Sequence, residues 1–138
     1  MITTIHDDKG AELATVITVG EYSNHEKVKF FSDPSESLQV GSLLFHKGDS
    51  VQPHIHRSKD VGTAYPIVEM ILVIRGTTDV DIYDEERKLV TTVTITAGTI
   101  LLLRRGGHGF RFPQYDTRLL DIRCGPYVDK KNDKEMIS

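Results

Sequence analysis

Three histidines and one glutamate in this chain have the residue types and the spacing of a metal site. His54 and His56 are separated by one residue, and twelve residues separate His56 from Glu69. His108 lies further along the chain. Because alternate residues of a strand project from the same face, His54 and His56 are both predicted to point into a barrel. Neutral imidazole and carboxylate ligands suit divalent Fe, Mn, Ni, Zn or Cu, and four such ligands leave one or two positions for water or substrate.

Glycines flank these residues at regular distances. Five residues lie between Gly48 and His54, and six lie between Glu69 and Gly76. This order is similar to the first motif of the cupin superfamily, G-x5-H-x-H-x3–4-E-x6-G, apart from the longer spacer before Glu69. The resemblance implies that the four residues named above bind one divalent transition metal, such as Fe, Mn, Ni or Zn, whose identity stays open.

The second cupin motif, G-x5-P-x-G-x2-H-x3-N, is matched less closely. Gly98, Gly106 and His108 fit it, with one residue missing before His108. Arg104 stands where proline is usual, and Phe112 replaces the asparagine. The resemblance supports His108 as a ligand but does not imply the glycine-proline turn. A flexible turn is the alternative reading of the Gly-Gly-His-Gly sequence at 106–109.

Four short strings narrow the resemblance. EMILVIRG at 69–76, DVDIYD at 79–84, GGHGF at 106–110 and CGPY at 124–127 are similar to strings that recur in a group of small stand-alone bacterial cupins. In that group the long spacer before the glutamate is normal. The resemblance covers about residues 41–127 and implies a single double-stranded β-helix, or jelly-roll barrel, with a metal site. It implies no particular reaction.

Length and composition favour one domain. The chain has 138 residues, of which 38% are hydrophobic and 27% charged, and these values are ordinary for a single globular core. We expect residues 1–138 to form one domain with a barrel core at about 38–127. The charged segment 129–138 has no pattern, and we expect it to be a loosely held tail.

Charge and cysteine content bear on partners and location. The net charge of −3 and the lack of a dense Lys/Arg cluster give no reason to expect nucleic acid as a partner. Cys124 is the only cysteine, so a reducing cytoplasm is the simplest location. Residues 1–8 lack the features of an export signal, and the longest aliphatic run, 100–103, is too short to span a membrane.

The pattern along the chain is that of an all-β protein. Thr, Val and Ile alternate in short runs bounded by turn residues, and the clearest runs are 14–19, 79–83 and 90–95. About eight strands at short spacing predict a sandwich or barrel. Connections are expected at 83–88, 96–98 and 112–116.

Strand alternation predicts which side chains line the barrel. If Glu69 faces inward, Ile71 and Val73 do so too, whereas Leu72 and Ile74 face outward and pack against another layer or a second subunit. An apolar outer face and an open sheet edge near the N-terminal strands predict a homodimer.

The same alternation from His108 places Phe110 and Phe112 inside and Arg111 outside, which gives the metal a dry wall. Two residues are candidates for moving protons, Glu69 and His46, although a surface histidine is the alternative for His46.

Other side chains are candidates for contacting a substrate. Arginines that would gather around an anionic substrate are Arg57, Arg75, Arg104 and Arg105, and a solvated arginine is the alternative for each. Tyr65 and Tyr115 lie in predicted loops. The segment 57–68 leaves the barrel beside the metal ligands, so we expect it to be a lid over the pocket or a subunit contact.

The expected function is that of a metal-dependent enzyme acting on a small oxygenated metabolite. Similar cupins carry out dioxygen chemistry on enediols, keto acids or thiols, and this dioxygenase-type reading is favoured because few general bases stand out. Isomerisation or epimerisation of a sugar or keto acid is one alternative. A non-catalytic module that binds a small molecule is another.

Overall fold

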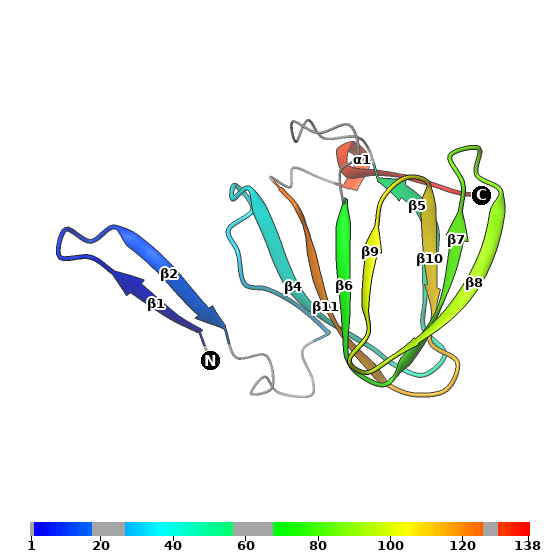
Figure 1. The fold of residues 1–138 in the computed structure, drawn as a ribbon, viewed down its shortest axis with the longest axis horizontal. Helices are drawn as coiled ribbons and strands as arrows, with labels where there is room; N and C mark the ends of the chain where they lie inside the picture. Colours follow the sequence, from blue (N-terminus) through cyan, green and yellow to red (C-terminus); the bar gives the residue numbers. More distant parts are fainter. Residues whose placement is uncertain (1, 18–26, 57–67, 126–129) are drawn as a thin grey trace.

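The computed structural model describes residues 2–17, 27–56, 68–125 and 130–138. Two five-stranded antiparallel sheets face each other in it (Figure 1). The order in the first sheet is β3 (Val28–Phe30), β4 (Leu38–Phe45), β11 (Thr117–Cys124), β6 (Glu69–Arg75) and β9 (Ile100–Leu103). The order in the second is β12 (Lys134–Met136), β5 (Ser50–His56), β10 (Gly107–Arg111), β7 (Thr77–Tyr83) and β8 (Leu89–Thr96).

The strands confirm the all-β prediction. Only one short helix, α1 (Lys130–Asp133), lies within the described parts of the chain. The expected connections at 83–88, 96–98 and 112–116 join β7 to β8, β8 to β9 and β10 to β11. Gly98 adopts φ +85° in the second of these, a conformation that glycine permits at low cost.

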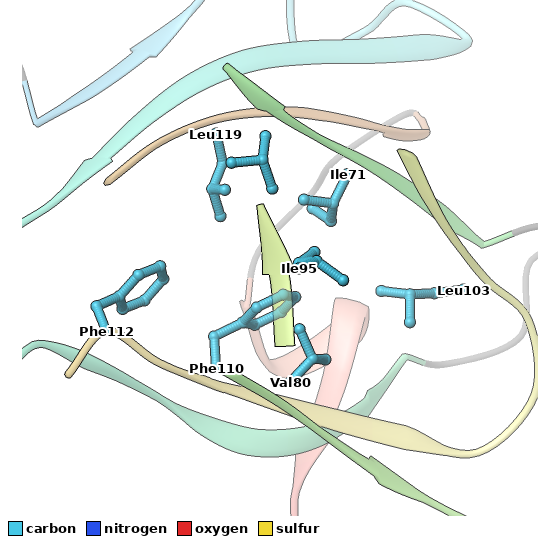
Figure 2. Close-up of a cluster of buried hydrophobic side chains, with 8 residues drawn as sticks. Ile71, Val80, Ile95, Leu103, Phe110, Phe112 and Leu119 are labelled. Atoms are coloured by element: carbon cyan, nitrogen blue, oxygen red, sulfur yellow. The ribbon is translucent and has the colours of Figure 1, made fainter. Parts of the chain in front are cut away.

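A hydrophobic core fills the space between the sheets (Figure 2). Ile71 and Val73 from β6 are 1% and 0% exposed, whereas Ile74 is 37% exposed on the other side of the strand. Phe110 and Phe112 are buried, and Arg111 points outward to Asp81. The predicted phases of both segments are therefore confirmed. The remaining core residues are Val80, Ile95, Leu103 and Leu119.

Close approach of backbones explains the glycines around His108. A Cβ on Gly107 would lie 2.8 Å from the backbone oxygen of His54, and one on Gly109 would lie 2.8 Å from Pro53. Because both glycines lie in β10, the flexible-turn alternative for the Gly-Gly-His-Gly sequence is wrong. The glycines let β10 lie tightly against β5.

The expectation of a loosely held tail at 129–138 is also wrong for residues 130–138, the part of it that the structure describes. β12 pairs with β5, Ile137 is 8% exposed, and its backbone N–H donates to Pro53 O at 2.8 Å. Asp133 at the end of α1 is 4% exposed. The charged composition gives no sign of this docking, because the segment is held by backbone pairing and one buried isoleucine and has no longer apolar pattern.

A separate hairpin precedes the barrel. It consists of β1 (Ile2–His6) and β2 (Glu12–Ile17), which pair only with each other among the strands of the described chain. Most of its residues are exposed, Leu13 by 64% and Val16 by 52%. In the described residues no helix is long and apolar enough to cross a membrane.

Candidate metal centre

The two sheets bring the four predicted ligands together at one end of the barrel. His54 and His108 lie directly opposite each other in the pairing of β5 with β10, so their side chains share a face. His56 lies two residues beyond His54 and projects from that same face. Glu69 begins β6 in the other sheet. Three imidazoles from one sheet thus face one carboxylate from the other.

The ligand atoms of these residues converge. One nitrogen from each histidine and one carboxylate oxygen of Glu69 all lie within 4.8 Å of one another. Nε2 of His56 is 2.8 Å from Oε2 of Glu69, and Nε2 of His108 is 3.2 Å from the same oxygen. The side chains of these three residues are between 3% and 8% exposed.

The lack of hydrogen-bond partners for the converging atoms is what a metal site would explain. His56 Nε2, His108 Nε2 and Glu69 Oε2 are buried and make no well-aligned hydrogen bond among the described residues. Buried polar atoms without such partners are costly, and three of them aimed at one point match the donor set of a divalent transition metal. His54 Nδ1 lies 2.8 Å from Gln52 O and donates a hydrogen bond to it. Nε2 of the neutral ring is then unprotonated and can bind a metal.

The surroundings of His54 and His56 shift the pKa values of these two histidines in opposite directions. Burial is the main cause that lowers the pKa of His54 to about 3, so its imidazole stays neutral. Burial also acts to lower the pKa of His56, but the carboxylates of Asp133 and Glu69 outweigh it and raise this pKa to about 9. In the metal-free protein both ring nitrogens of His56 are therefore protonated at neutral pH, and the ring is positively charged.

Two buried carboxyl groups lie side by side at the site. Burial alone would raise the pKa of Glu69, yet His108, His56 and Asp121 together hold it well below its ordinary value. Burial and the negative charge of Glu69 raise the pKa of Asp121 well above its ordinary value. Glu69 is thus the ionised member of the pair, as a metal ligand must be.

Asp133 and Arg123 form a second layer behind the ligands. Asp133 Oδ2 is 3.4 Å from His56 Nδ1 and 3.3 Å from Arg123 Nη1. Arg123 Nη2 in turn contacts Asp121 Oδ2 at 3.0 Å. A carboxylate behind a ligating histidine fixes the orientation of the ring and the tautomer that binds metal.

A cavity of about 80 Å³ adjoins the ligands. Its apolar side includes Phe45, Ile71, Phe110 and Leu119, and its polar side includes Asp121, Arg123 and Lys134. Ile71 and Phe110, which strand alternation predicts to face inward, are among these apolar lining residues. A metal of coordination number five or six held by these four residues would keep positions on the cavity side for a small molecule.

Other candidate residues lie elsewhere. His46 precedes β5, whereas the histidine ligands lie at the far end of that strand. Its side chain is 57% exposed, and Nδ1 is 3.5 Å from Asp116 Oδ2, so the structure does not bring it to the ligands. Arg75, Arg104, Arg105 and Tyr115 are exposed and do not line the cavity. Arg57, Tyr65 and most of the predicted lid at 57–68 lie outside the described residues.

Four residues of the site escaped sequence analysis. Asp121 and Arg123 share the inward phase of Leu119 on β11, so alternation along that strand was a usable signal. Asp133 and Lys134 carried no such signal, because they lie in a charged segment. The C-terminal segment also brings a cation, Lys134, to the cavity. The predicted arginines Arg75, Arg104 and Arg105 do not line it.

Comparison with known proteins establishes the fold. The chain matches no family model and no curated relative. An uncharacterised protein with a double-stranded β-helix domain from Klebsiella pneumoniae has a TM-score of 0.62 at 15% identity, over 89% of this chain and 96% of that one. A cupin-2 domain protein from Shewanella frigidimarina has a TM-score of 0.54 at 13% identity, over 75% and 85%.

The fold is that of a cupin. A third structure, of the DMSP lyases RdDddP and RnDddQII, has a TM-score of 0.56 at 14% identity, and the match covers 80% of this chain and 52% of that one. At these identities the likeness concerns the fold alone, and the chemistry of this barrel depends on its own residues.

Replacing either β5 histidine tests the ligand assignment. We expect His54→Ala and His56→Ala to abolish tight metal binding and to leave the barrel folded, because the hydrophobic core supplies most of the stability. Metal content and circular dichroism of protein purified without a histidine tag provide the measurement. His46→Ala is the control and should keep its metal. Near-full metal occupancy in both β5 variants would refute the assignment.

As the pH is lowered, metal affinity should begin to fall at a higher pH than it would if His56 had the ordinary histidine pKa. Because the metal must displace the proton of His56, whose pKa is about 9, apparent affinity should fall about tenfold for each pH unit below that value. Competition with a chelator between pH 6 and 9 measures the slope. Constant affinity down to about 6.5, the unperturbed histidine value, would show that His56 is not held protonated.

The contact between Asp133 and His56 predicts an effect at a residue that does not bind metal. Above about pH 9, where the proton on His56 no longer competes with the metal, we expect Asp133→Asn to lower metal affinity by roughly 10- to 100-fold, because the His56 ring loses its orienting carboxylate. Chelator competition measures the affinity, and nitrogen chemical shifts of His56 report its tautomer. Glu135→Gln, two residues away and exposed, is the matched control. Equal affinities in the two variants would contradict the orienting role.

Proposed function

We propose that this cupin is a metal-dependent enzyme that acts on a small oxygenated metabolite, with dioxygenase-type chemistry favoured. The observation that carries the proposal is the convergence of three imidazoles and Glu69 within 4.8 Å, beside a cavity. A divalent transition metal held there supplies Lewis acidity toward substrate oxygens and, as iron or manganese, redox chemistry. We also infer membership of the small stand-alone bacterial cupins with GGHGF and GPY motifs, and a cytoplasmic location.

Residues of the chain have separate tasks in this proposal. His54, His56, Glu69 and His108 hold the metal. The apolar side of the cavity, which includes Phe110 and Leu119, keeps bulk water away and so strengthens electrostatic interactions at the site.

Isomerisation or epimerisation is the second candidate, and one observation favours it. Asp121 is 1% exposed and lines the cavity, and burial together with the negative charge of Glu69 raises its pKa well above the ordinary value. A carboxyl group in that position can take a proton from, or give one to, a bound substrate. Asp121 is a better placed proton carrier than His46.

Oxygen uptake and proton exchange distinguish these functions. The iron-reconstituted protein is given enediols, 2-oxo acids and thiols, and oxygen consumption is followed with His54→Ala as the control for free metal. We expect uptake that depends on His54 and persists in Asp121→Asn. Deuterium exchange from solvent into substrate without oxygen, abolished by Asp121→Asn, would instead establish an isomerase. Saturable binding without either reaction would establish a binding module.

We further propose that two copies of the chain form a homodimer. Apolar side chains lie on the outer face of the first sheet, where Ile74, Ile100 and Leu102 are 37% to 58% exposed. The exposed β1–β2 hairpin also supports a dimer, because an isolated two-stranded hairpin is marginally stable in water. Contact with a second copy would cover both surfaces.

Sedimentation at micromolar concentration tests the dimer. We expect the mass of two chains, and we expect Ile100→Asp to shift the equilibrium toward monomer because it places a charge in the apolar face. Val90→Asp, at an exposed valine on β8, is the control. A wild-type protein that sediments as a monomer would contradict the proposal.

A further inference from the structure

An outer groove adjoins the metal cavity. Its volume is about 540 Å³, whereas the cavity beside the ligands measures about 80 Å³. Leu43, Arg123 and Lys134 line both spaces and therefore form the junction between them. Pockets that enclose whole small molecules measure roughly 300–1,000 Å³, so the cavity alone has room for only the reacting end of a metabolite. The rest of the molecule would have to lie in the outer groove.

The walls of the groove are largely apolar. Val28 and Phe30 of β3 line it and are 55% and 46% exposed, and Pro34 and Leu43 complete the apolar lining. Gln39 also lines the groove, but its amide nitrogen donates to three backbone oxygens of the preceding turn, at 2.9 to 3.3 Å. Away from the charged side chains of Arg123, Asp133 and Lys134, the groove thus offers a ligand mainly apolar surface.

The junction between groove and cavity is cationic, and strand register explains why. Arg123 lies directly opposite Glu69 in the pairing of β11 with β6. Lys134 lies directly opposite His56 in the pairing of β12 with β5. Because directly opposite residues project from the same face, each sheet places one cation beside a metal ligand.

Charge at the junction favours an anion. Even when Glu69, Asp121 and Asp133 are all ionised, a bound divalent cation together with Arg123 and Lys134 leaves the lining with net positive charge. In a partly dry site this charge attracts a carboxylate more strongly than it would in water. The apolar groove wall requires in addition that the rest of the ligand be hydrophobic.

We propose that groove and cavity form one substrate site, which takes a small carboxylate with an apolar body, such as an aryl or alkyl 2-oxo acid. The apolar body lies against Val28, Phe30 and Leu43, and the carboxylate lies at the junction beside Lys134 and Arg123. This inference rests on the metal-dependent function proposed above and adds the class of substrate to it.

Binding to the zinc-loaded full chain tests the proposal without turnover. Four probes separate the two requirements, namely phenylpyruvate, 2-oxooctanoate, pyruvate without an apolar body, and 1-phenylpropan-2-one without a carboxylate. Calorimetry should show that phenylpyruvate and 2-oxooctanoate bind at least about tenfold more tightly than the other two. Zinc content is measured in the same samples, so a failure of metal binding is distinguished from a failure of this inference.

Two variants locate the binding surfaces. Val28→Asp places a charge in the groove wall on an exposed edge strand, and it should weaken phenylpyruvate about tenfold while leaving pyruvate unchanged. Lys134→Gln should weaken phenylpyruvate and pyruvate alike by about tenfold, with zinc retained. The matched controls are Val90→Asp on the exposed edge strand β8, and Lys131→Gln on the exposed side of α1; neither should change binding.

Two results would overturn the proposal. One is equal binding of all four probes by protein that has its full zinc content. The other is binding of phenylpyruvate that neither Val28→Asp nor Lys134→Gln weakens, which would place the ligand away from the groove and its junction.

Discussion

Burial of the Glu69 carboxylate is the constraint on which the site depends. Glu69 is 6% exposed at the end of a barrel whose core is aliphatic and aromatic. An ionised carboxylate in such a place costs several kcal/mol unless opposite charge and hydrogen-bond donors compensate it. Three histidine side chains face it, and the proton on His56 compensates its charge in the metal-free protein. A bound metal would take over that role, so metal and proton compete for the same place.

The costly site adjoins the hydrophobic core that holds the fold together, because Ile71, Phe110 and Leu119 of the core cluster also line its cavity. The buried cluster around Val73, Val80 and Phe112 contains no charged group. The ligands come from the ends of strands in both sheets, where backbone pairing fixes their positions without help from a metal. Glycines at 107 and 109 bring β10 close to β5, and so set how far apart His54 and His108 lie.

The C-terminal segment links the barrel fold to the chemistry of the site. Pairing of β12 with β5 delivers Asp133 to the back of His56 and Lys134 to the front of the cavity. Two neighbouring residues of opposite charge thus do different work, one on the protein ligand and one on the space that a substrate would enter. Asp133 also ties the segment electrostatically to His56 and to Arg123.

Features that depend on local pattern could be predicted from the order of the amino acids. Two-residue alternation predicted strands, the inward phase of Ile71, Val73, Phe110 and Phe112, and the all-β barrel. Residue type and spacing predicted four ligands, and the structure brings these four together.

Features that depend on pairing between distant segments could not be predicted in this way. The register of β12 with β5 recruited Asp133 and Lys134, although a short charged segment carries no periodic signal of docking. His46 precedes β5, whereas His54 and His56 lie at the far end of that strand. His46 is therefore separated from them in space although it is near them in sequence. Spacing along one strand is a local property, whereas strand neighbours and the end of the barrel at which a side chain emerges are set by how the whole chain folds.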